Sequence, residues 1–440
     1  MICGSLVTNQ AAALGRLDSL IMEQLHSLME WSNHARSLMT AQDNLIKEMP
    51  WEKTAMGALG VSLSQLRFAV ALFSSVYLAV GVRLFRAPTA RHLYSLLTGF
   101  LLVYYPFGAG VAQVVFPLAW TYLTMLLAPR ACGTLSWVNM MYLIWLHVIN
   151  ASGEAWQNGQ MDFTGGSMTL VLKLIALANC YADAYKRTPL SSYQSTHKVD
   201  RLPSPLAFLG YAFSFGNMLA GPYFEFADYD AFIRQQGPWD RKAHPRGAPF
   251  LLHGLSRMCH ALFFMASMLY LEPRYGTAML YMPWYKALSL PARLALQWPC
   301  GIVCQLRYFF VWKLSEASMV FAGLDLAGWD RDSGKPQWGR LCNVRFWGVQ
   351  LSEYSRAIPG HWNILTGQFL RRYVYERLTP AGKRPGFPQL LATQLVSGVW
   401  HGLYPGYLLF FASSALMLQA GTGVQRLEGV LVPAKLRNLL

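Results

Sequence analysis

The stretch "LYSLLTGFLLVYYPFGAGVAQVVFPLAWTYLTMLLAP", residues 93–129, contains no Asp, Glu, Lys or Arg. A hydrocarbon core about 30 Å thick is crossed by roughly 20 helical residues, so this stretch is long enough for two crossings. Further charge-free stretches lie at 131–153, 202–224 and 385–425, and the last of them could also cross twice. The sequence therefore predicts an all-α, polytopic integral membrane protein.

Shorter or interrupted apolar stretches could supply further transmembrane helices. They lie at 68–82, at 247–271, which contains Arg257, and at 294–312, which contains Arg307. The composition agrees, since only 13% of the residues are charged, against about 25% in a soluble domain. We expect eight to eleven transmembrane helices, some of them short or broken, together with re-entrant or interfacial helices.

The formal charge of +15 raises the possibility of a nucleic-acid partner. However, Lys and Arg are scattered through short loops such as 186–201, 234–246 and 383–384. This distribution is typical of positive-inside loops that face anionic headgroups or a phosphorylated ligand, so we expect membrane lipids and no nucleic acid as partners. The seven cysteines show no zinc-ligand spacing and no disulfide framework.

The chain divides into two parts by composition. Residues 1–60 mix charged and apolar positions, which predicts an amphipathic, interfacial segment, and residues 61–440 form one membrane domain. Within this domain, residues 323–360 mix charges with several tryptophans. Aromatic rings at headgroup depth and protein-shielded backbone explain such a mixture, so we expect folded interfacial or re-entrant structure there.

An ionisable residue, His401, lies in the apolar stretch "SGVWHGLYPGYLLFF", residues 397–411. At membrane depth such a group costs several kcal/mol unless it faces a cavity or a partner. The glycines and the proline that follow predict a broken helix, and Trp400 with Tyr404 could wall a pocket. An imidazole in that pocket could act as a general base toward a hydroxyl.

Two alternatives remain for this histidine. It could be a neutral imidazole that is hydrogen-bonded inside a helix bundle, which is the ordinary role that we expect for His147 and His260. It could instead activate Ser397, one helical turn earlier, as a nucleophile. The second alternative requires a third, orienting group, which the sequence does not provide.

The segment "HWNILTGQFLRRYVYERLTP", residues 361–380, predicts a half-buried helix with a basic flank, which Pro380 stops. Asn363 stands at its start. Its amide could orient a substrate or donate a hydrogen bond to a developing oxyanion. A helix N-cap is an equally good interpretation of this asparagine.

Two other stretches place polar groups beside apolar helices. In "GNMLAGPYFEFADYDAFI", residues 216–233, Glu225 follows a Gly-Pro pair among aromatic residues, and the stretch by itself indicates an interfacial turn. In "DFTGGSMTLVLKLIALA", residues 162–178, N-capping explains the polar start. Lys173 lies inside this second helix, where we expect it to snorkel to the surface or to pair with an acid.

These four fragments, in this order, resemble the membrane-bound O-acyltransferase (MBOAT) family, and in particular its lysophospholipid acyltransferase branch. The most specific likeness is a WHGxxPGY element at 400–407 that follows a WNxxT element at 362–366. The resemblance spans about 162–411 and implies a multi-helix fold that encloses a catalytic chamber. Only residues 402–440 follow His401, whereas relatives usually continue with further membrane helices, so we expect either a short member of the family or a chamber whose C-terminal wall is built differently.

The resemblance also implies an activity and its site. Members of this branch transfer an acyl group from acyl-CoA to the free hydroxyl of a lysophospholipid in the endoplasmic reticulum membrane, without a metal, a cofactor or an acyl-enzyme. His401 and Asn363 would be the catalytic pair. Basic residues after Asn363 could bind the CoA phosphates, although positive-inside anchoring explains each of them equally well. The candidate substrate-binding residues are Trp362, Trp400, Tyr404, Glu225, Arg371, Arg372 and Arg377.

Two other functions remain open at this point. The same chemistry could serve another acceptor, namely diacylglycerol, a sterol, an alcohol or a protein. A remote alternative is a proton-coupled transporter in which His401, Glu225 and Asp162 relay protons, because ionisable groups at membrane depth also mark such pathways.

Overall fold

The computed structural model describes residues 44–150, 161–245, 247–380 and 382–431. Most of the segment 1–60 therefore lies outside the described residues. Its last part forms helix α2 (Pro50–Leu59). The buried Glu52 of α2 anchors this helix, because its carboxylate accepts hydrogen bonds from Arg67 at 2.7 and 2.9 Å and from the Tyr105 hydroxyl at 2.7 Å.

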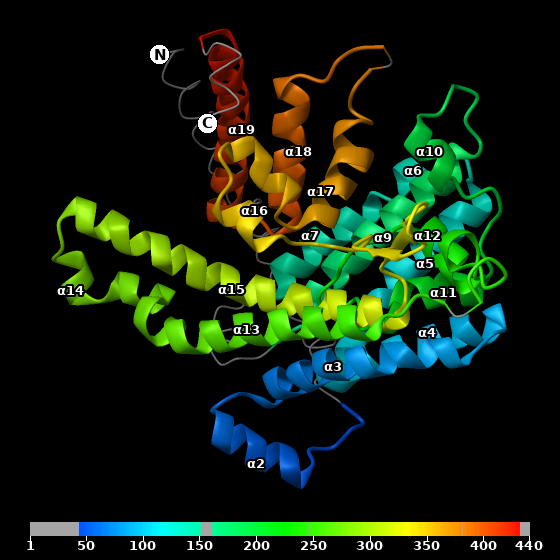
Figure 1. The fold of residues 1–440 in the computed structure, drawn as a ribbon, viewed down its shortest axis with the longest axis horizontal. Helices are drawn as coiled ribbons and strands as arrows, with labels where there is room; N and C mark the ends of the chain where they lie inside the picture. The colour runs from blue at the N-terminus through cyan, green and yellow to red at the C-terminus, as the bar shows by residue number, and fades with distance from the viewer. Residues whose placement is uncertain (1–43, 151–160, 246, 381, 432–440) are drawn as a thin grey trace, which may run out of the picture.

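Helices make up nearly all of the regular structure in the described residues (Figure 1). The α-helices that follow α2 are α3 (Leu63–Val80), α4 (Pro88–Phe107), α5 (Val115–Leu127), α6 (Cys132–Leu135), α7 (Val138–Asn150), α9 (Thr164–Asp183), α10 (Ser192–His197), α11 (Pro205–Phe213), α12 (Phe226–Ile233), α13 (Leu251–Tyr275), α14 (Pro283–Lys286), α15 (Leu290–Ala322), α16 (Phe346–Gln350), α17 (Ile364–Leu370), α18 (Phe387–Trp400) and α19 (Pro405–Leu431). Short 3-10 turns are η1 (Gly81–Leu84), η2 (Gly108–Val114), η3 (Ser214–Gly216), η4 (Gly237–Trp239), η5 (Thr277–Tyr281) and η6 (Ser355–Gly360), and η7 (Arg371–Tyr375) is a π-helix.

The predicted all-α, polytopic membrane class is confirmed. In the described residues, six stretches are long and apolar enough to cross a membrane. This number is lower than the eight to eleven expected, and helices such as α11 and α18, with 9 and 14 residues, are shorter than a full crossing requires. The six stretches are Leu63–Leu84, Pro88–Leu127, Cys132–Asn150, Thr164–Asp183, Leu251–Tyr281 and Pro405–Glu428.

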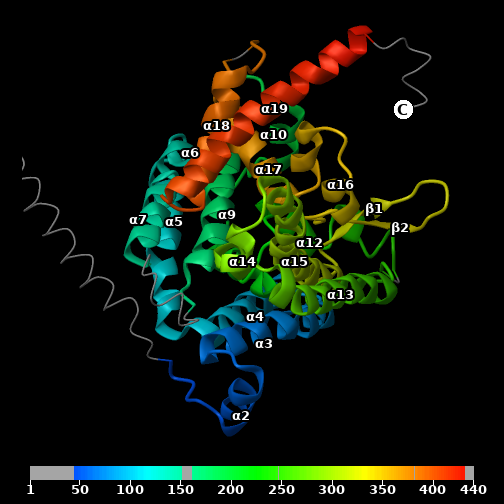
Figure 2. The same cartoon turned by 90° about the vertical axis from the view of Figure 1, so that its left-hand side faces the viewer.

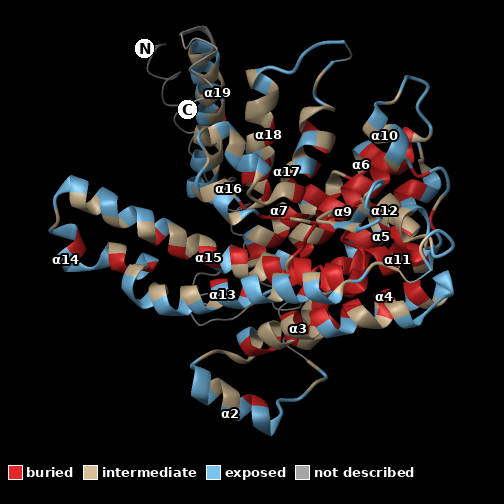
Figure 3. Cartoon of the chain, in the orientation of Figure 1, coloured by how far each residue is buried: buried red, intermediate tan, exposed pale blue. Residues whose placement is uncertain are grey.

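Helix α9 forms the centre of the core. It is buried along almost its whole length, and it packs against α5, α6, α7 and α11 (Figure 3). In contrast, the paired helices α13 and α15 project from the body, and both they and α19 expose many large apolar side chains (Figures 1 and 3). Exposed apolar surface of this extent suits contact with lipid.

Lys173, in the interior of α9, neither snorkels nor pairs with an acid, so both expectations for it are wrong. The side chain is fully buried, and its ammonium donates to the Tyr211 carbonyl and to the Ala212 carbonyl at 3.2 Å. It also donates to Ser214 Oγ at 3.0 Å and to Asn217 Oδ1 at 3.1 Å. The cation therefore binds the C-terminal end of α11, where free carbonyls carry partial negative charge.

We expect Lys173→Met to lower the melting temperature of the protein in detergent. The substitution keeps the apolar stem but removes the ammonium that donates to these buried oxygens, and a buried group left without a donor costs about 1–3 kcal/mol. Tryptophan fluorescence during heating measures the effect. Lys198→Met is the control, because this lysine is substantially exposed. Equal melting curves for the two variants would contradict a structural role for Lys173.

Residues 323–360 are folded, as expected, but they include a hairpin that the all-α prediction did not contain. Strands β1 (Leu326–Trp329) and β2 (Pro336–Trp338) pair antiparallel. The buried Asp325 holds the base of the hairpin by accepting from the Gly339 and Leu341 amides at 2.9 and 2.7 Å. Burial raises the pKa of this carboxyl to about 6.

Candidate active site

The predicted helix break at His401 is confirmed. Helix α18 ends at Trp400 and α19 begins at Pro405, and the two helices pack side by side (Figure 2). His401 caps the end of α18, and its amide donates to a carbonyl of the last turn at 3.1 Å. Gly402 has a φ of 116°, which suits glycine, and thereby lets the chain reverse.

Aromatic rings surround the half-buried His401. Its imidazole stacks on Phe411 at a centroid distance of 5.2 Å and also contacts Trp400 at 4.7 Å and Tyr407 at 5.4 Å. Tyr404 is half exposed and contacts Tyr407 instead. Within the described part of the chain, neither ring nitrogen of His401 has a hydrogen-bond partner.

His147 and His260, the two histidines expected to be hydrogen-bonded inside the bundle, differ from each other in the structure. His147 of α7 is hydrogen-bonded inside the bundle, as expected, with Nε2 3.0 Å from the Trp400 carbonyl. Trp400 Nε1 in turn donates to the Met168 carbonyl at 3.0 Å. These contacts fix the end of α18 against α7 and α9. His260 is exposed on α13, so the prediction of a place inside the bundle is wrong for it.

Asn363 stands at the N-cap position of α17, but its side chain does not cap the helix. Asn343 performs this task from another segment: its carbonyl accepts from the Ile364 amide at 2.8 Å, and its Oδ1 accepts from the Leu365 amide at 3.1 Å. The N-cap interpretation of Asn363 is therefore wrong. The backbone of Asn363 is left-handed, with φ 45° and ψ 50°, a conformation that asparagine tolerates better than most residues.

A buried network holds the Asn363 side chain. Asn343 Nδ2 donates to Asn363 Oδ1 at 3.2 Å, while the Asn343 amide donates to Glu316 Oε1 at 2.8 Å. Lys313 completes the network by donating to Glu316 Oε2 at 2.6 Å and to the Val344 carbonyl at 2.7 Å. Because the amide oxygen of Asn363 is occupied, its NH₂ group is the part that remains for a ligand, and this group has no partner within the described residues.

Trp362 belongs to an aromatic cluster on α15. Its ring lies 4.9 Å from Trp312 and 5.5 Å from Tyr308, measured between centroids. Trp362 also contacts Phe309 of the same helix, at a centroid distance of 5.5 Å. Aromatic contacts therefore hold the residue before Asn363 against α15.

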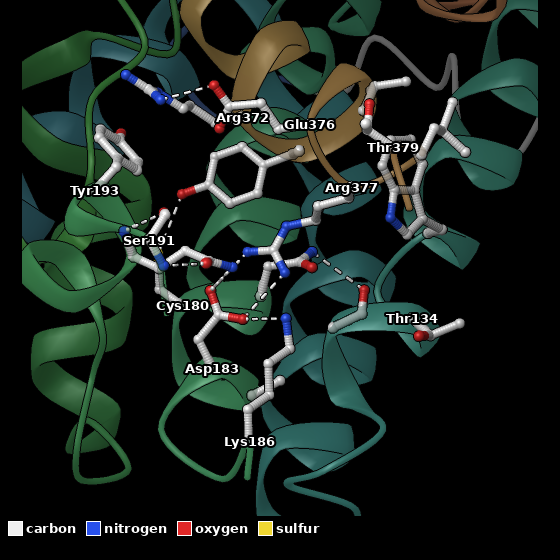
Figure 4. Close-up of a pocket in the computed structure, with 18 of the residues that line it drawn as sticks. Thr134, Cys180, Asp183, Lys186, Ser191, Tyr193, Arg372, Glu376, Arg377 and Thr379 are labelled. Atoms are coloured by element: carbon white, nitrogen blue, oxygen red, sulfur yellow. Dashed lines mark hydrogen bonds and ion pairs between the residues drawn. The ribbon is translucent and has the colours of Figure 1, made fainter. Parts of the chain in front are cut away.

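A cavity of about 720 Å³ lies between α6, α9, the π-helix η7 and α18 (Figure 4). Neither His401 nor Asn363 is among the described residues that line it. Val396 does line it, and this residue precedes His401 by five positions, which is roughly 7.5 Å along a helix. The charged side chains of the lining are Arg130, Lys186, Arg372, Arg377, Asp183 and Glu376.

Two of the three arginines predicted to bind substrate line this cavity, and both are paired with acids (Figure 4). Arg377 donates two hydrogen bonds to Asp183, at 3.1 and 2.7 Å. Arg372 donates to Glu376 at 2.8 Å. Arg371 is exposed, pairs with the same glutamate and does not line the cavity. Arg371 and Arg372 lie in a π-helix, a feature often found at functional sites.

Glu225 lies behind the wall of the cavity and is buried, so the interpretation as an interfacial turn is wrong for its side chain. Its carboxylate accepts hydrogen bonds from Tyr193 at 2.6 Å, from Tyr373 at 2.8 Å and from Tyr223. Burial raises the pKa of Tyr193 and Tyr373, and the negative charge of Glu225 adds to this shift. Both phenols therefore stay protonated and act as donors, and Glu225 fixes two tyrosines that line the cavity.

Comparison with known proteins supports the resemblance. Residues 148–428 match the model of the membrane-bound O-acyltransferase family. Lysophospholipid acyltransferase 1 of Arabidopsis thaliana is 36% identical, with 87% of this chain and 84% of the relative covered. Lysophospholipid acyltransferase of Schizosaccharomyces pombe is 30% identical, with 82% and 72% covered. Membrane-bound glycerophospholipid O-acyltransferase 1 of Homo sapiens is 27% identical, with 83% and 77% covered. With its apolar helices and the histidine and asparagine elements in the expected order, the chain belongs to the membrane-bound O-acyltransferase family.

Proposed function

We propose that this protein is a lysophospholipid acyltransferase that uses acyl-CoA, and that it works in the endoplasmic reticulum membrane. The names of its relatives support the substrate class. The observation that carries the chemistry is His401, a half-buried imidazole in a broken helix surrounded by aromatic rings, whose two nitrogens have no hydrogen-bond partner among the described residues.

In the proposed mechanism, His401 accepts the proton of the lysophospholipid hydroxyl as the oxygen attacks the thioester carbonyl. The Asn363 NH₂ group donates a hydrogen bond to the oxygen on which negative charge develops. When the carbon–sulfur bond breaks, the imidazolium returns its proton to the CoA thiolate. The thioester is already activated, so the protein mainly has to position two lipids and to keep water away from them.

The cavity of about 720 Å³ is the proposed place for the phosphate-bearing part of CoA. Four cationic and two anionic side chains line it, which leaves a net charge of +2. Arg372 stacks on Tyr193 with its guanidinium 4.2 Å from the ring centroid, and Arg377 lies 5.3 Å from the Tyr373 ring. Arg371, outside the lining, would meet phosphates only at the entrance. Trp362, Trp400 and Tyr404 would contact the lipid chains near the reacting atoms.

We expect Arg372→Gln to raise the KM for acyl-CoA several-fold while kcat changes little. The substitution removes a positive charge from the proposed phosphate site, but it leaves His401 and Asn363 in place. Steady-state kinetics with varied acyl-CoA measures both constants. Arg187→Gln, which removes an exposed charge after α9, is the matched control. An unchanged KM in Arg372→Gln would contradict the placement of CoA in this cavity.

The whole assignment is tested by incubating the purified protein with mixed lysophospholipids and mixed acyl-CoAs and then measuring the lipids by mass spectrometry. We expect new diacyl phospholipids in amounts equal to the CoA released. Acylation of only diacylglycerol, a sterol, an alcohol or a protein would replace the acceptor in this proposal. Proton-dependent flux in liposomes without consumption of acyl-CoA would replace the enzyme with a transporter.

A further inference from the structure

Three arginines converge where α3 ends and α4 begins. Arg83 lies in η1, Arg91 in the first turn of α4, and Arg241 shortly after η4. Together they line a second cavity, of about 50 Å³, which shares no residue with the cavity of about 720 Å³. None of the three forms an ion pair with a carboxylate in the described part of the chain. The cavity is thus lined by positive charge without a counter-charge.

Arg91 is the most unusual of the three. Only 3% of its surface is exposed, and its Nε has no hydrogen-bond partner within the described residues. One face of the guanidinium covers the Phe232 ring, 4.5 Å from the centroid. Because Arg91 has no acidic partner among the described residues, its buried charge is costly in free energy, and this group is expected to meet an anion that enters the cavity.

Contacts with neighbouring residues hold Arg83 and Arg241 in the lining of the same cavity as Arg91. Arg83 stacks on Phe250 at 3.9 Å and donates one hydrogen bond to the Phe321 carbonyl at 2.9 Å. With its amide oxygen turned toward the arginines, Gln235 accepts from Arg91 at 2.6 Å and from Arg241 at 3.2 Å. The backbone of Gln235 is left-handed, with a φ of 56°, because this residue forms the C-terminal cap of α12, in which the Gln236 amide donates to the Ala231 carbonyl at 2.8 Å.

The size and the position of this cavity indicate its ligand. A volume of about 50 Å³ admits roughly three or four waters, which is the scale of one phosphate group and too small for a nucleotide or an acyl chain. The arginines flank the turn between two apolar stretches that are long enough to cross a membrane, Leu63–Leu84 and Pro88–Leu127. Trp239 and Trp329 also line the cavity, and tryptophan is enriched at headgroup depth.

We propose that Arg83, Arg91 and Arg241 bind the phosphate of an anionic phospholipid headgroup, at a site separate from the catalytic one. Guanidinium groups suit this ligand because their planar N–H donors can bind two phosphate oxygens at once. The three like charges repel one another, and a phosphate offsets this repulsion. The bound lipid joins the turn between α3 and α4 to the loop that follows α12. The proposal does not depend on the acyl-transfer reaction.

The test measures the melting temperature of the purified full-length protein in neutral detergent. We expect phosphatidic acid in the micelles to raise it by at least about 2 °C relative to the same amount of phosphatidylcholine, because a ligand that binds only the folded state stabilises it. Arg241→Gln, an exposed position with little risk to folding, should lose most of this shift. Lys242→Gln removes the neighbouring exposed charge and should keep it.

Each other outcome overturns the proposal. Equal melting temperatures in phosphatidic acid and phosphatidylcholine would exclude a site for anionic headgroups. A full shift in Arg241→Gln would place the lipid elsewhere on the protein. An equal shift from inorganic phosphate alone, without phosphatidic acid, would make the ligand a free anion and not a lipid.

Discussion

His401→Ala is expected to lower kcat for acyl transfer by at least about 100-fold, since a positioned general base contributes typically 10²–10⁴-fold. The substitution removes the only group proposed to take the proton of the acceptor hydroxyl. The acyl-CoA KM should change little, because the proposed phosphate contacts lie around the cavity near α9 and η7. Release of CoA at saturating acyl-CoA and lysophospholipid measures kcat.

His260→Ala provides the matched control for this experiment. It removes another imidazole from an apolar helix, but this ring is exposed and bonds only to the Ser256 carbonyl of its own helix. The kcat of His260→Ala should remain within about two-fold of that of the unmodified protein, because surface substitutions have small effects. Both variants should elute as folded protein in detergent. A folded His401→Ala that turns over at the control rate would refute the assignment of the base.

The class of fold could be predicted because its signal is local. An unpaired charge or an unsatisfied backbone group is expensive in lipid, so membrane helices must appear as long charge-free stretches. The helix break at His401 could also be predicted, because the residues that cause it, Gly402 and Pro405, follow His401 closely in the sequence. Physical constraints that act within a few residues leave a pattern that can be read without a structure.

The polar contacts could not be predicted, because their partners lie far apart in the sequence. Lys173 binds carbonyls that follow it by 38 and 39 positions, and Glu225 accepts from Tyr373, 148 positions away. Tertiary packing brings these partners together, and no local sequence pattern predicts them. One signal was available and was missed: Lys313 and Glu316 have i,i+3 spacing within an otherwise apolar stretch, which is typical of a buried ion pair.

His401 and Asn363 were singled out from the residues around them, and the resemblance made them the expected catalytic pair, but the side chains that support them were not predicted. Sequence gave two equal interpretations for Asn363, as a helix cap or as a functional amide. The structure excludes the first, since Asn343 caps α17. The Asn363 side chain does not cap the helix, and a buried network holds it in place. Such a residue is a better candidate for catalysis than one that only starts a helix.

We expect Asn363→Ala to lower kcat by about 10²–10³-fold, the loss found when one oxyanion donor is removed. Asn343→Ala should also lower kcat, because Asn343 fixes the Asn363 oxygen and so aims its NH₂ group. It should in addition cost about 1 kcal/mol of stability, since α17 loses its cap. Asn343→Asp separates the two effects: its carboxylate can still accept from the Leu365 amide, but it cannot donate to Asn363.

A double-mutant cycle tests whether Asn343 acts through Asn363. If it positions that amide, Asn343→Ala should slow the unmodified enzyme but should not slow Asn363→Ala any further, because residues that act as a unit are not additive. The measurement is kcat for the four proteins at one temperature, with melting curves to confirm folding. If Asn343→Ala lowers kcat by the same factor in the unmodified enzyme and in Asn363→Ala, Asn343 supports the reaction by another route. The buried network from Lys313 to Asn363 would then serve the fold alone.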